Sequence, residues 1–212
     1  MLEPSEREQL RARGGRRIFP AGATLMHEGQ IGEEVILIES GRVKVHSAIR
    51  DGRDVILRFC GPGDLLGEIS VIDDEPRSGT VEALEPVEAL AISATDFRGF
   101  LESHPPACLI LLRMVTHRFR DADRKRIEFA ASHTLGRVAA RLVELAERYG
   151  EATDAGIVID LRLSQEELAG WTASSREAVA KALHTLRDLE LVVTERRRIT
   201  VLDLEGLARQ AA

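Results

Sequence analysis

Cysteine, aromatic residues and long apolar runs are all scarce in this chain of 212 residues. The two cysteines, Cys60 and Cys108, cannot supply the set of thiolates that an iron–sulfur cluster needs. Each has apolar neighbours, so we expect both to be buried free thiols. No run approaches the ~18 apolar residues of a membrane span, and the first residues lack the apolar core of a signal peptide. We therefore expect a cytoplasmic protein without membrane contact.

Several kinds of chemistry are also missing. The sequence has no phosphate-binding loop of the Walker type, no paired nucleophile and base, and no histidines at metal-site spacing. We therefore predict neither an enzyme nor a metalloprotein. The net charge of −6 argues only weakly against nucleic-acid binding, because phosphate contact needs a local basic face rather than a basic chain.

What is present begins with a β-rich half. From about residue 17 to residue 92, short strand-like segments alternate with glycine turns. One of them, 42–49, has Val43 and Val45 on one face and Lys44 and His46 on the other. Such evenly spaced strands predict an antiparallel barrel or sandwich. Glycine and proline then disappear over 107–131, which predicts one long helix.

One face of that helix has the three-and-four spacing of a coiled-coil seam. The seam comprises Leu112, Val115, Phe119, Ala122, Arg126 and Phe129. Its charged flanks favour a dimer contact over the alternative, a helix packed only on its own β domain. The predicted organisation is a β-rich domain over 1–106, a long dimerisation helix over 107–132, and a C-terminal domain over 133–212. The polar break at 132–134 is the predicted hinge.

Two short capped helices joined by a turn follow, which is the pattern of a helix-turn-helix. Ser164 and Glu167 predict a capping box at the start of the first helix. Ser174 and Glu177 have the same spacing and predict a cap at the start of the second helix. The predicted apolar face of the second helix comprises Val179, Ala182, Leu183 and Leu186.

Charged residues at the start of the second helix suit direct reading of base pairs. Arg176 can donate to guanine O6 and N7, Glu177 can accept from the cytosine amino group, and Lys181 can reach guanine or a phosphate. Segments 191–194 and 199–202 predict a β-hairpin. Its tip holds Arg196, Arg197 and Arg198. Arginines there would bind the DNA backbone, which positions a protein without reading sequence.

Together these motifs resemble the cyclic-AMP receptor protein/FNR family of bacterial transcription regulators over nearly the whole chain. Two motifs carry the resemblance: 163–168 followed by 174–179, and 67–71 followed by 76–80. It implies an α+β fold with an N-terminal cyclic-nucleotide-binding-type β-roll (a double-stranded β-helix or jelly roll), the long dimerisation helix and a C-terminal winged helix-turn-helix. It also implies a homodimer on a pseudo-palindromic, TGTGA-like operator, with RNA polymerase as a candidate partner. The residues expected at DNA are Ser164, Gln165, Ser174, Ser175, Arg176, Glu177, Lys181, Arg196, Arg197 and Arg198.

The motif at 67–80 resembles the family's phosphate-binding cassette. Glu68 can accept from a ribose 2′-hydroxyl, while Arg77 and Ser78 can hold a cyclic phosphate. The residues expected at an effector are Gly67, Glu68, Ile69, Arg77, Ser78 and Asp123. In members that bind cyclic AMP, the long helix contacts the adenine where this chain has Ala122 and Asp123. Two interpretations stay open: a cyclic-nucleotide sensor, most simply for cyclic AMP, or a pocket that answers to another ligand or to none.

A rival class is a cyclic-nucleotide-binding module that controls a partner protein without DNA. Such a module has no need of the arginines at 196–198 beside an Arg-Glu helix. The sequence therefore favours the transcription regulator, with DNA affinity that falls steeply as salt rises.

Overall fold

A computed structural model of the chain describes residues 4–49, 54–159, 163–195 and 198–211. The chain divides into two compact units. The first comprises Met1–Gly52 and Ile56–Arg120, and the second Arg53–Val55 and Asp121–Ala212. No helix within the described ranges is long and apolar enough to cross a membrane.

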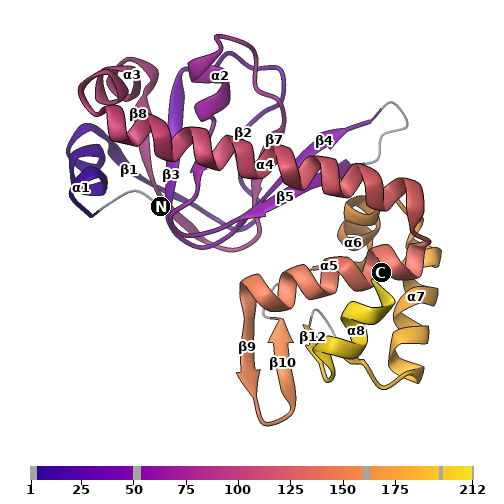
Figure 1. The fold of residues 1–212 in the computed structure, drawn as a ribbon. Coiled ribbons are helices and arrows are strands. Elements are labelled where there is room, and N and C mark those ends of the chain that lie inside the picture. The colour runs from indigo at the N-terminus through magenta and orange to yellow at the C-terminus, as the bar shows by residue number, and fades with distance from the viewer. Residues whose placement is uncertain (1–3, 50–53, 160–162, 196–197, 212) are drawn as a thin grey trace. The chain divides into compact units, whose positions relative to one another are not determined.

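The first unit is built on two antiparallel four-stranded sheets, with strand orders β1-β8-β3-β6 and β2-β7-β4-β5 (Figure 1). The strands are β1 (Gly15–Phe19), β2 (Thr24–Met26), β3 (Glu34–Ser40), β4 (Val43–Ala48), β5 (Asp54–Cys60), β6 (Leu65–Leu66), β7 (Thr80–Ala83) and β8 (Val87–Ser93). The helices are α1 (Pro4–Arg13), α2 (Glu68–Ile72), α3 (Ala94–Ser103) and α4 (Pro105–Ala131), which continues into the second unit. The predicted antiparallel β domain, followed by one long helix, is confirmed.

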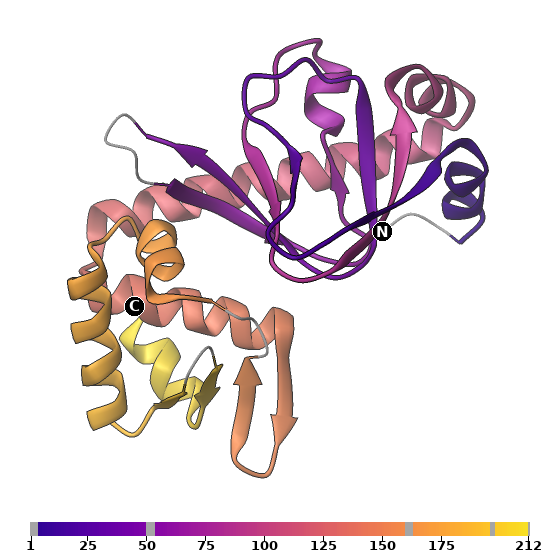
Figure 2. The ribbon, with the colours of Figure 1, turned by 180° about the vertical axis from the view of Figure 1, so that it is seen from behind.

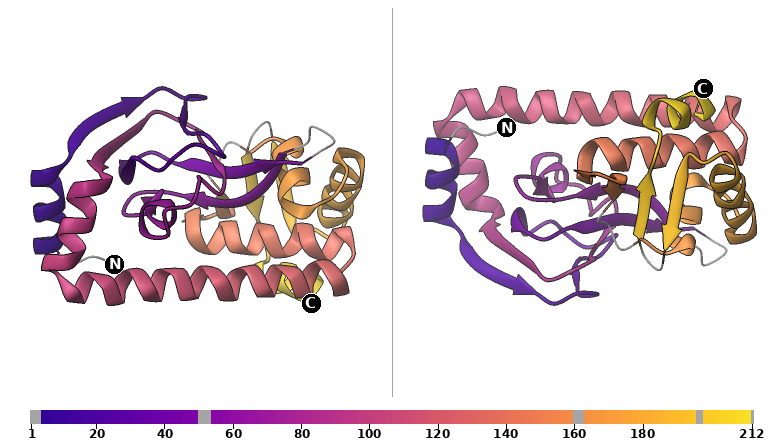
Figure 3. Two further views of the ribbon diagram at one scale, coloured as in Figure 1. Left: turned by 90° about the horizontal axis from the view of Figure 1, so that it is seen from above. Right: turned by 90° about the horizontal axis from the view of Figure 1, so that it is seen from below.

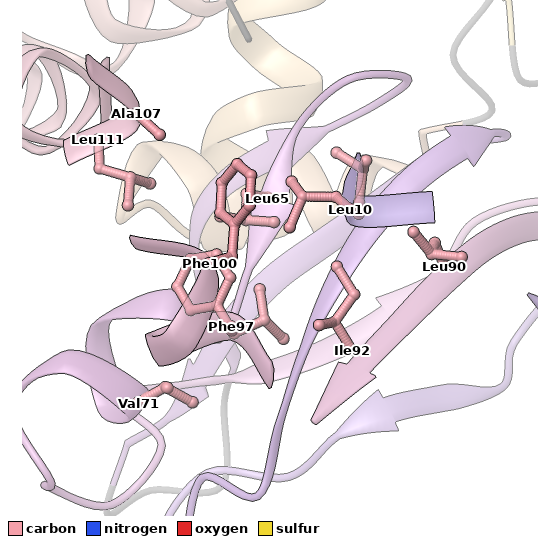
Figure 4. Close-up of a cluster of buried hydrophobic side chains, with 11 residues drawn as sticks. Leu10, Leu65, Val71, Leu90, Ile92, Phe97, Phe100, Ala107 and Leu111 are labelled. Carbon is pink, nitrogen blue, oxygen red and sulfur yellow. The ribbon is translucent and has the colours of Figure 1, made fainter. Parts of the chain in front are cut away.

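One hydrophobic core lies where α1, α3 and the start of α4 pack on the sheet of β8 and β3 (Figure 4). Phe97 and Phe100 of α3 are fully buried there, and Ala107 and Leu111 join them from α4. Cys60 is buried as predicted, but Cys108 is exposed, so that prediction is wrong. Because a helix turns by about 100° per residue, Ala107 and Leu111 point inward while Cys108 points away.

A second core cluster fills the space between the two sheets and includes Met26, Val45 and Val81. His46 was predicted on the polar face of its strand, yet it is only 8% exposed. A neighbouring side chain covers part of the imidazole: Glu82 Oε2 of β7 lies 3.8 Å from His46 Nε2. Strand alternation alone does not reveal that the second face is covered.

The second unit consists of short helices and one four-stranded sheet of order β11-β12-β10-β9 (Figures 2 and 3). Its helices besides the end of α4 are α5 (Thr134–Tyr149), α6 (Gln165–Thr172), α7 (Arg176–Asp188) and α8 (Leu204–Gln210). Its strands are β9 (Gly150–Thr153), β10 (Gly156–Ile159), β11 (Val192–Glu195) and β12 (Arg198–Val201). The predicted break at 132–134 is confirmed, since α4 ends at Ala131 and α5 begins at Thr134.

Candidate functional site

The helix-turn-helix is formed by α6 and α7. The capping box predicted at the start of α6 is present: Ser164 Oγ accepts from the Glu167 N–H, and the Glu167 carboxylate accepts from the Ser164 N–H. The helix ends at Ala173, which takes the left-handed conformation with φ 47°. An alanine in that region is uncommon, and here it makes the turn that allows α7 to start three residues later.

Ser175, not Ser174, is the N-cap of α7, so the predicted cap is wrong by one residue. Ser175 Oγ accepts from the Ala178 N–H at 3.1 Å. Ser174 Oγ instead accepts from the guanidinium of Arg137 on α5. Both serines carry a hydroxyl that could cap a helix; Ser175 caps α7, and Ser174 is engaged by Arg137.

The predicted faces of α7 are confirmed. Its buried residues are Val179, Ala182, Leu183 and Leu186. Arg176, Glu177 and Lys181 are exposed on the opposite side, together with Ser164 and Gln165 at the start of α6. Exposed donors and acceptors in the first turns of a helix are what base reading in a major groove requires.

A β-hairpin of β11 and β12 follows α7, with Glu195 paired to Arg198 in the register. Arg198 is exposed, while the predicted contacts Arg196 and Arg197 lie outside the described residues. The hairpin is joined to α7 because Arg187 Nη1 donates to Thr194 Oγ1 at 2.8 Å. Helix and hairpin therefore form a winged helix-turn-helix.

Arg137 on α5 joins the turn of this motif to the hinge, a role that the sequence analysis missed. Its guanidinium donates to the Thr172 carbonyl at 2.8 Å and to the Ser132 carbonyl at 2.6 Å, besides its bond to Ser174. One side chain thus connects the end of α4, the start of α5 and the turn between α6 and α7. Its only sequence signal is its place in the first turn of α5, shortly after the hinge.

In the first unit, the cassette residues predicted at an effector come together around one small cavity. The lining consists of Met26, Val45, Arg58, Leu66, Gly67, Glu68, Ile69, Ser70, Arg77, Ser78, Gly79 and Val81. Its volume is about 30 Å³, enough for about two water molecules. A cyclic nucleotide is larger than this space. Among the described residues, no group of histidine, cysteine, aspartate and glutamate side chains could hold a metal ion.

Arg77 lines this cavity and is only 6% exposed. Its guanidinium donates to the Gly67 carbonyl at 2.6 Å, to Ser70 Oγ at 2.7 Å and to the Glu34 carbonyl. Burial lowers the pKa of Arg77, and the carboxylates of Glu34 and Glu68 act in the opposite direction. A side chain at Gly67 would overlap the Arg77 guanidinium, so the glycine is what lets this cation lie against the backbone.

Glu68 is 1% exposed and forms an ion pair with Arg118 of α4. Arg118 also donates to the Leu65 carbonyl at 3.1 Å. Glu68 Oε2 is buried and accepts no hydrogen bond from any group that the structure describes. A buried carboxylate oxygen without a donor costs free energy, and a ligand hydroxyl would supply the missing donor. Arg77, Ser78 and Glu68 therefore place a cation, a hydroxyl group and an unsatisfied acceptor around one cavity.

Arg118 was not predicted at this site. In the sequence it is one of several charged residues flanking the seam, and no local pattern distinguishes it from the others. Its partner Glu68 lies 50 residues away in the chain. Asp123, the predicted base-reading residue, belongs to the second unit, where it lies 3.9 Å from Arg126, and its role stays a prediction.

The seam residues of α4 are exposed in the single chain. Leu112 is 61%, Val115 37% and Phe119 66% exposed. The alternative, in which this stripe packs on its own β domain, is therefore wrong, since Ala107 and Leu111 take that role. An apolar stripe of this spacing needs another partner to leave water.

A β-roll with charged groups around a small cavity, followed by a winged helix-turn-helix, defines a class of proteins: transcription regulators that combine a sensor domain with a DNA reader. Comparison with known families supports both halves. A cyclic nucleotide-binding domain model matches residues 16–104, and a Crp-like helix-turn-helix domain model matches residues 136–210.

Several relatives match along most of the chain. A CRP-like cAMP-activated global transcriptional regulator of Mycobacterium tuberculosis is 32% identical over 91% of this chain and 86% of that protein. The crystal structure of a CRP-family transcriptional regulator from Thermus thermophilus has a TM-score of 0.78 at 28% identity, covering 92% of this chain and 96% of that one. The structure of the c-di-GMP responsive regulator CLP of Xanthomonas campestris shares the fold at 22% identity, with a TM-score of 0.82, covering 95% of this chain and 100% of that one. The chain belongs to the CRP/FNR family of transcription regulators.

Proposed function

We propose that this protein is a homodimeric transcription regulator whose affinity for a pseudo-palindromic, TGTGA-like operator is controlled by a cyclic nucleotide. The observation that carries the proposal is the buried, charged cavity of the sensor unit. There, Arg77 lies beside Glu68, whose Oε2 lacks a hydrogen-bond donor among the described residues. Several family relatives are named as cAMP-activated regulators, which makes cyclic AMP the first effector to test. RNA polymerase remains a predicted partner.

The effector acts by competing for contacts that the protein makes with itself. A cyclic phosphate offers Arg77 stronger, charged acceptors than the carbonyls and hydroxyl it binds in this structure. A ribose hydroxyl at Glu68 reaches the same carboxylate that holds Arg118 of α4. Ligand binding therefore alters the ion pair between Glu68 and Arg118, which joins the β-roll to the long helix. For this to change DNA affinity, the ligand must bind the DNA-competent state more tightly than the other state.

At the operator, Arg176, Glu177 and Lys181 of each protomer enter the major groove of one half-site. A twofold dimer presents two such helices, so the half-sites lie about one helical turn apart. Arg198 and the predicted contacts Arg196 and Arg197 bind the flanking phosphates. These contacts make affinity fall as salt rises without adding sequence preference.

Replacing Arg176 by alanine is expected to weaken operator binding by about 5- to 150-fold, the loss of one bidentate contact with guanine. Fluorescence anisotropy with a labelled operator measures the change, and the same titration on scrambled DNA should show little effect. Arg209→Ala, an exposed arginine on α8, is the control. Equal losses on both DNAs would assign Arg176 to the backbone instead. Binding that is absent at any salt would favour a module that acts on a partner protein.

Replacing Arg77 by alanine is expected to abolish the effect of cyclic nucleotide on operator affinity, because the phosphate loses its cation. Anisotropy titrations with and without cyclic AMP or cyclic GMP measure the ratio of affinities. Arg16→Ala, an exposed arginine on β1, should keep the full response. If Arg77→Ala responded to nucleotide as the parent protein does, gating through this cavity would be wrong.

A further inference from the structure

The effector cavity contains a second arginine, Arg58 of β5, which the cassette motif does not include. The cavity is lined by one face of the sheet β2-β7-β4-β5. Across that face Met26 pairs with Val81, and Val81 with Val45. Arg58 on the edge strand β5 also lines the cavity, as the one charged residue that this sheet contributes.

The three arginines near the cavity differ in their partners. Arg77 donates to three acceptors of the protein, and Arg118 is paired with Glu68. Arg58 is partly buried, and no hydrogen bond or ion pair joins it to another residue within the described part of the chain. A guanidinium drawn partly out of water without an acceptor costs free energy. An acceptor on a ligand would offset that cost.

The charge around the cavity shows which part of the ligand is left for Arg58. With the Glu68 carboxylate neutralised by Arg118, Arg77 suffices for the single negative charge of a cyclic phosphate. Glu68 Oε2 remains for the sugar hydroxyl. The part of a cyclic nucleotide that still needs a partner is therefore the base.

An arginine fork distinguishes purines. It donates two parallel hydrogen bonds to acceptors that lie side by side, and guanine offers O6 and N7 in that arrangement. Adenine offers N7 beside an amino group, and two donors that face each other repel. Arg58 would therefore favour a base with a 6-carbonyl group over adenine.

We propose that Arg58 is the base-reading residue of the effector site and makes it selective for a guanine-bearing cyclic nucleotide. This inference rests on the proposed function, since it requires that a cyclic nucleotide occupy the cavity. It departs from cyclic AMP as the simplest effector. Recognition comes from the sheet of the β-roll, and it does not depend on Ala122 or Asp123 of the long helix.

The test is calorimetry of the full-length protein with cyclic GMP, cyclic IMP and cyclic AMP. Cyclic IMP differs from cyclic AMP only at position 6 and the adjoining nitrogen, so it isolates the carbonyl that Arg58 would bind. Cyclic GMP and cyclic IMP are expected to bind more tightly than cyclic AMP. Arg58→Met keeps an apolar stem and should weaken both 6-carbonyl ligands by about 5- to 150-fold while leaving cyclic AMP affinity unchanged or higher.

Two further variants define the outcomes. Arg58→Lys keeps the charge but loses the two parallel donors, so it should reduce the preference for cyclic GMP and cyclic IMP over cyclic AMP. Arg16→Met, on the other sheet, should leave that preference unchanged. Thermal melting shows that each variant is folded. Tighter binding of cyclic AMP, or a preference that survives Arg58→Met, overturns the inference and leaves the proposed function standing. Absence of binding by all three nucleotides overturns both.

Discussion

The variant Arg141→Ala is expected to lose about 3–5 kcal/mol of unfolding free energy in the second unit, the loss found when one partner of a buried ion pair is removed. Arg141 of α5 is 7% exposed. Its guanidinium pairs with Glu128 of α4 and, at 2.7 Å, with Glu144, and it lies 5.4 Å from the centre of the Trp171 ring. In the alanine variant, the partly buried carboxylate of Glu128 would lose this cationic partner.

The same cluster contains Lys125, near the end of α4. Its ammonium lies 5.5 Å from the centre of the Trp171 ring on α6. Burial lowers the pKa of Lys125, with Glu144 acting against it. The cluster thus joins the last turns of α4 to α5 and α6 by buried charges. Its loss should uncouple the end of the long helix from the helix-turn-helix, beyond its effect on stability.

Trp171 is the single tryptophan of the chain, so its fluorescence reports unfolding of this unit directly. Urea titrations followed by fluorescence and by circular dichroism measure the change. Arg209→Ala is the control. It removes an exposed ion pair, in which Arg209 Nη2 lies 3.7 Å from Asp203 Oδ2, and should lower the unfolding free energy by at most about 1 kcal/mol. The double variant Arg141→Met with Glu128→Gln removes both charges and should recover much of the loss. A loss below about 1 kcal/mol in Arg141→Ala would show that the pair contributes little.

Features set by neighbouring residues could be predicted from the sequence. The apolar face of α7 follows from helical spacing, and the capping box of α6 from two residues three apart. The boundary between α4 and α5 was likewise marked by a short polar break. In each case, the residues that determine the structure lie within one or two turns of one another.

Features set by distant residues could not be predicted in the same way. The pair of Glu68 and Arg118 requires the β-roll to bring α4 alongside α2, and no local pattern marks either partner. Ser174 and Ser175 both carry a hydroxyl suited to capping, and no local pattern shows that Ser174 contacts Arg137 while Ser175 caps the helix. The inward direction of Arg58 depends on how β5 pairs in its sheet. The cassette motif therefore predicted residues that line the cavity but not the second cation beside them.

Phe119→Glu is expected to convert the protein from dimer to monomer and to weaken operator binding by about 100- to 10,000-fold. Phe119 is 66% exposed in the single chain and lies at the centre of the apolar stripe that we assign to the dimer. In a twofold seam, the introduced carboxylate would face its own copy, and burying like charges without a partner is costly. A monomer binds each half-site separately, so it loses the effective concentration that links the two.

Sedimentation equilibrium gives the oligomeric state, and anisotropy with a full operator and a single half-site gives the two affinities. Arg113→Glu, exposed on the same helix outside the stripe, changes the charge by more and should remain dimeric. Binding of a single half-site should be nearly unchanged in Phe119→Glu, because α7 keeps its fold and its exposed face. A variant that stayed dimeric with full affinity would exclude this face of α4 as the contact. In that case the exposed Leu112, Val115 and Phe119 would need a different partner, since an apolar stripe of this spacing is not stable in water.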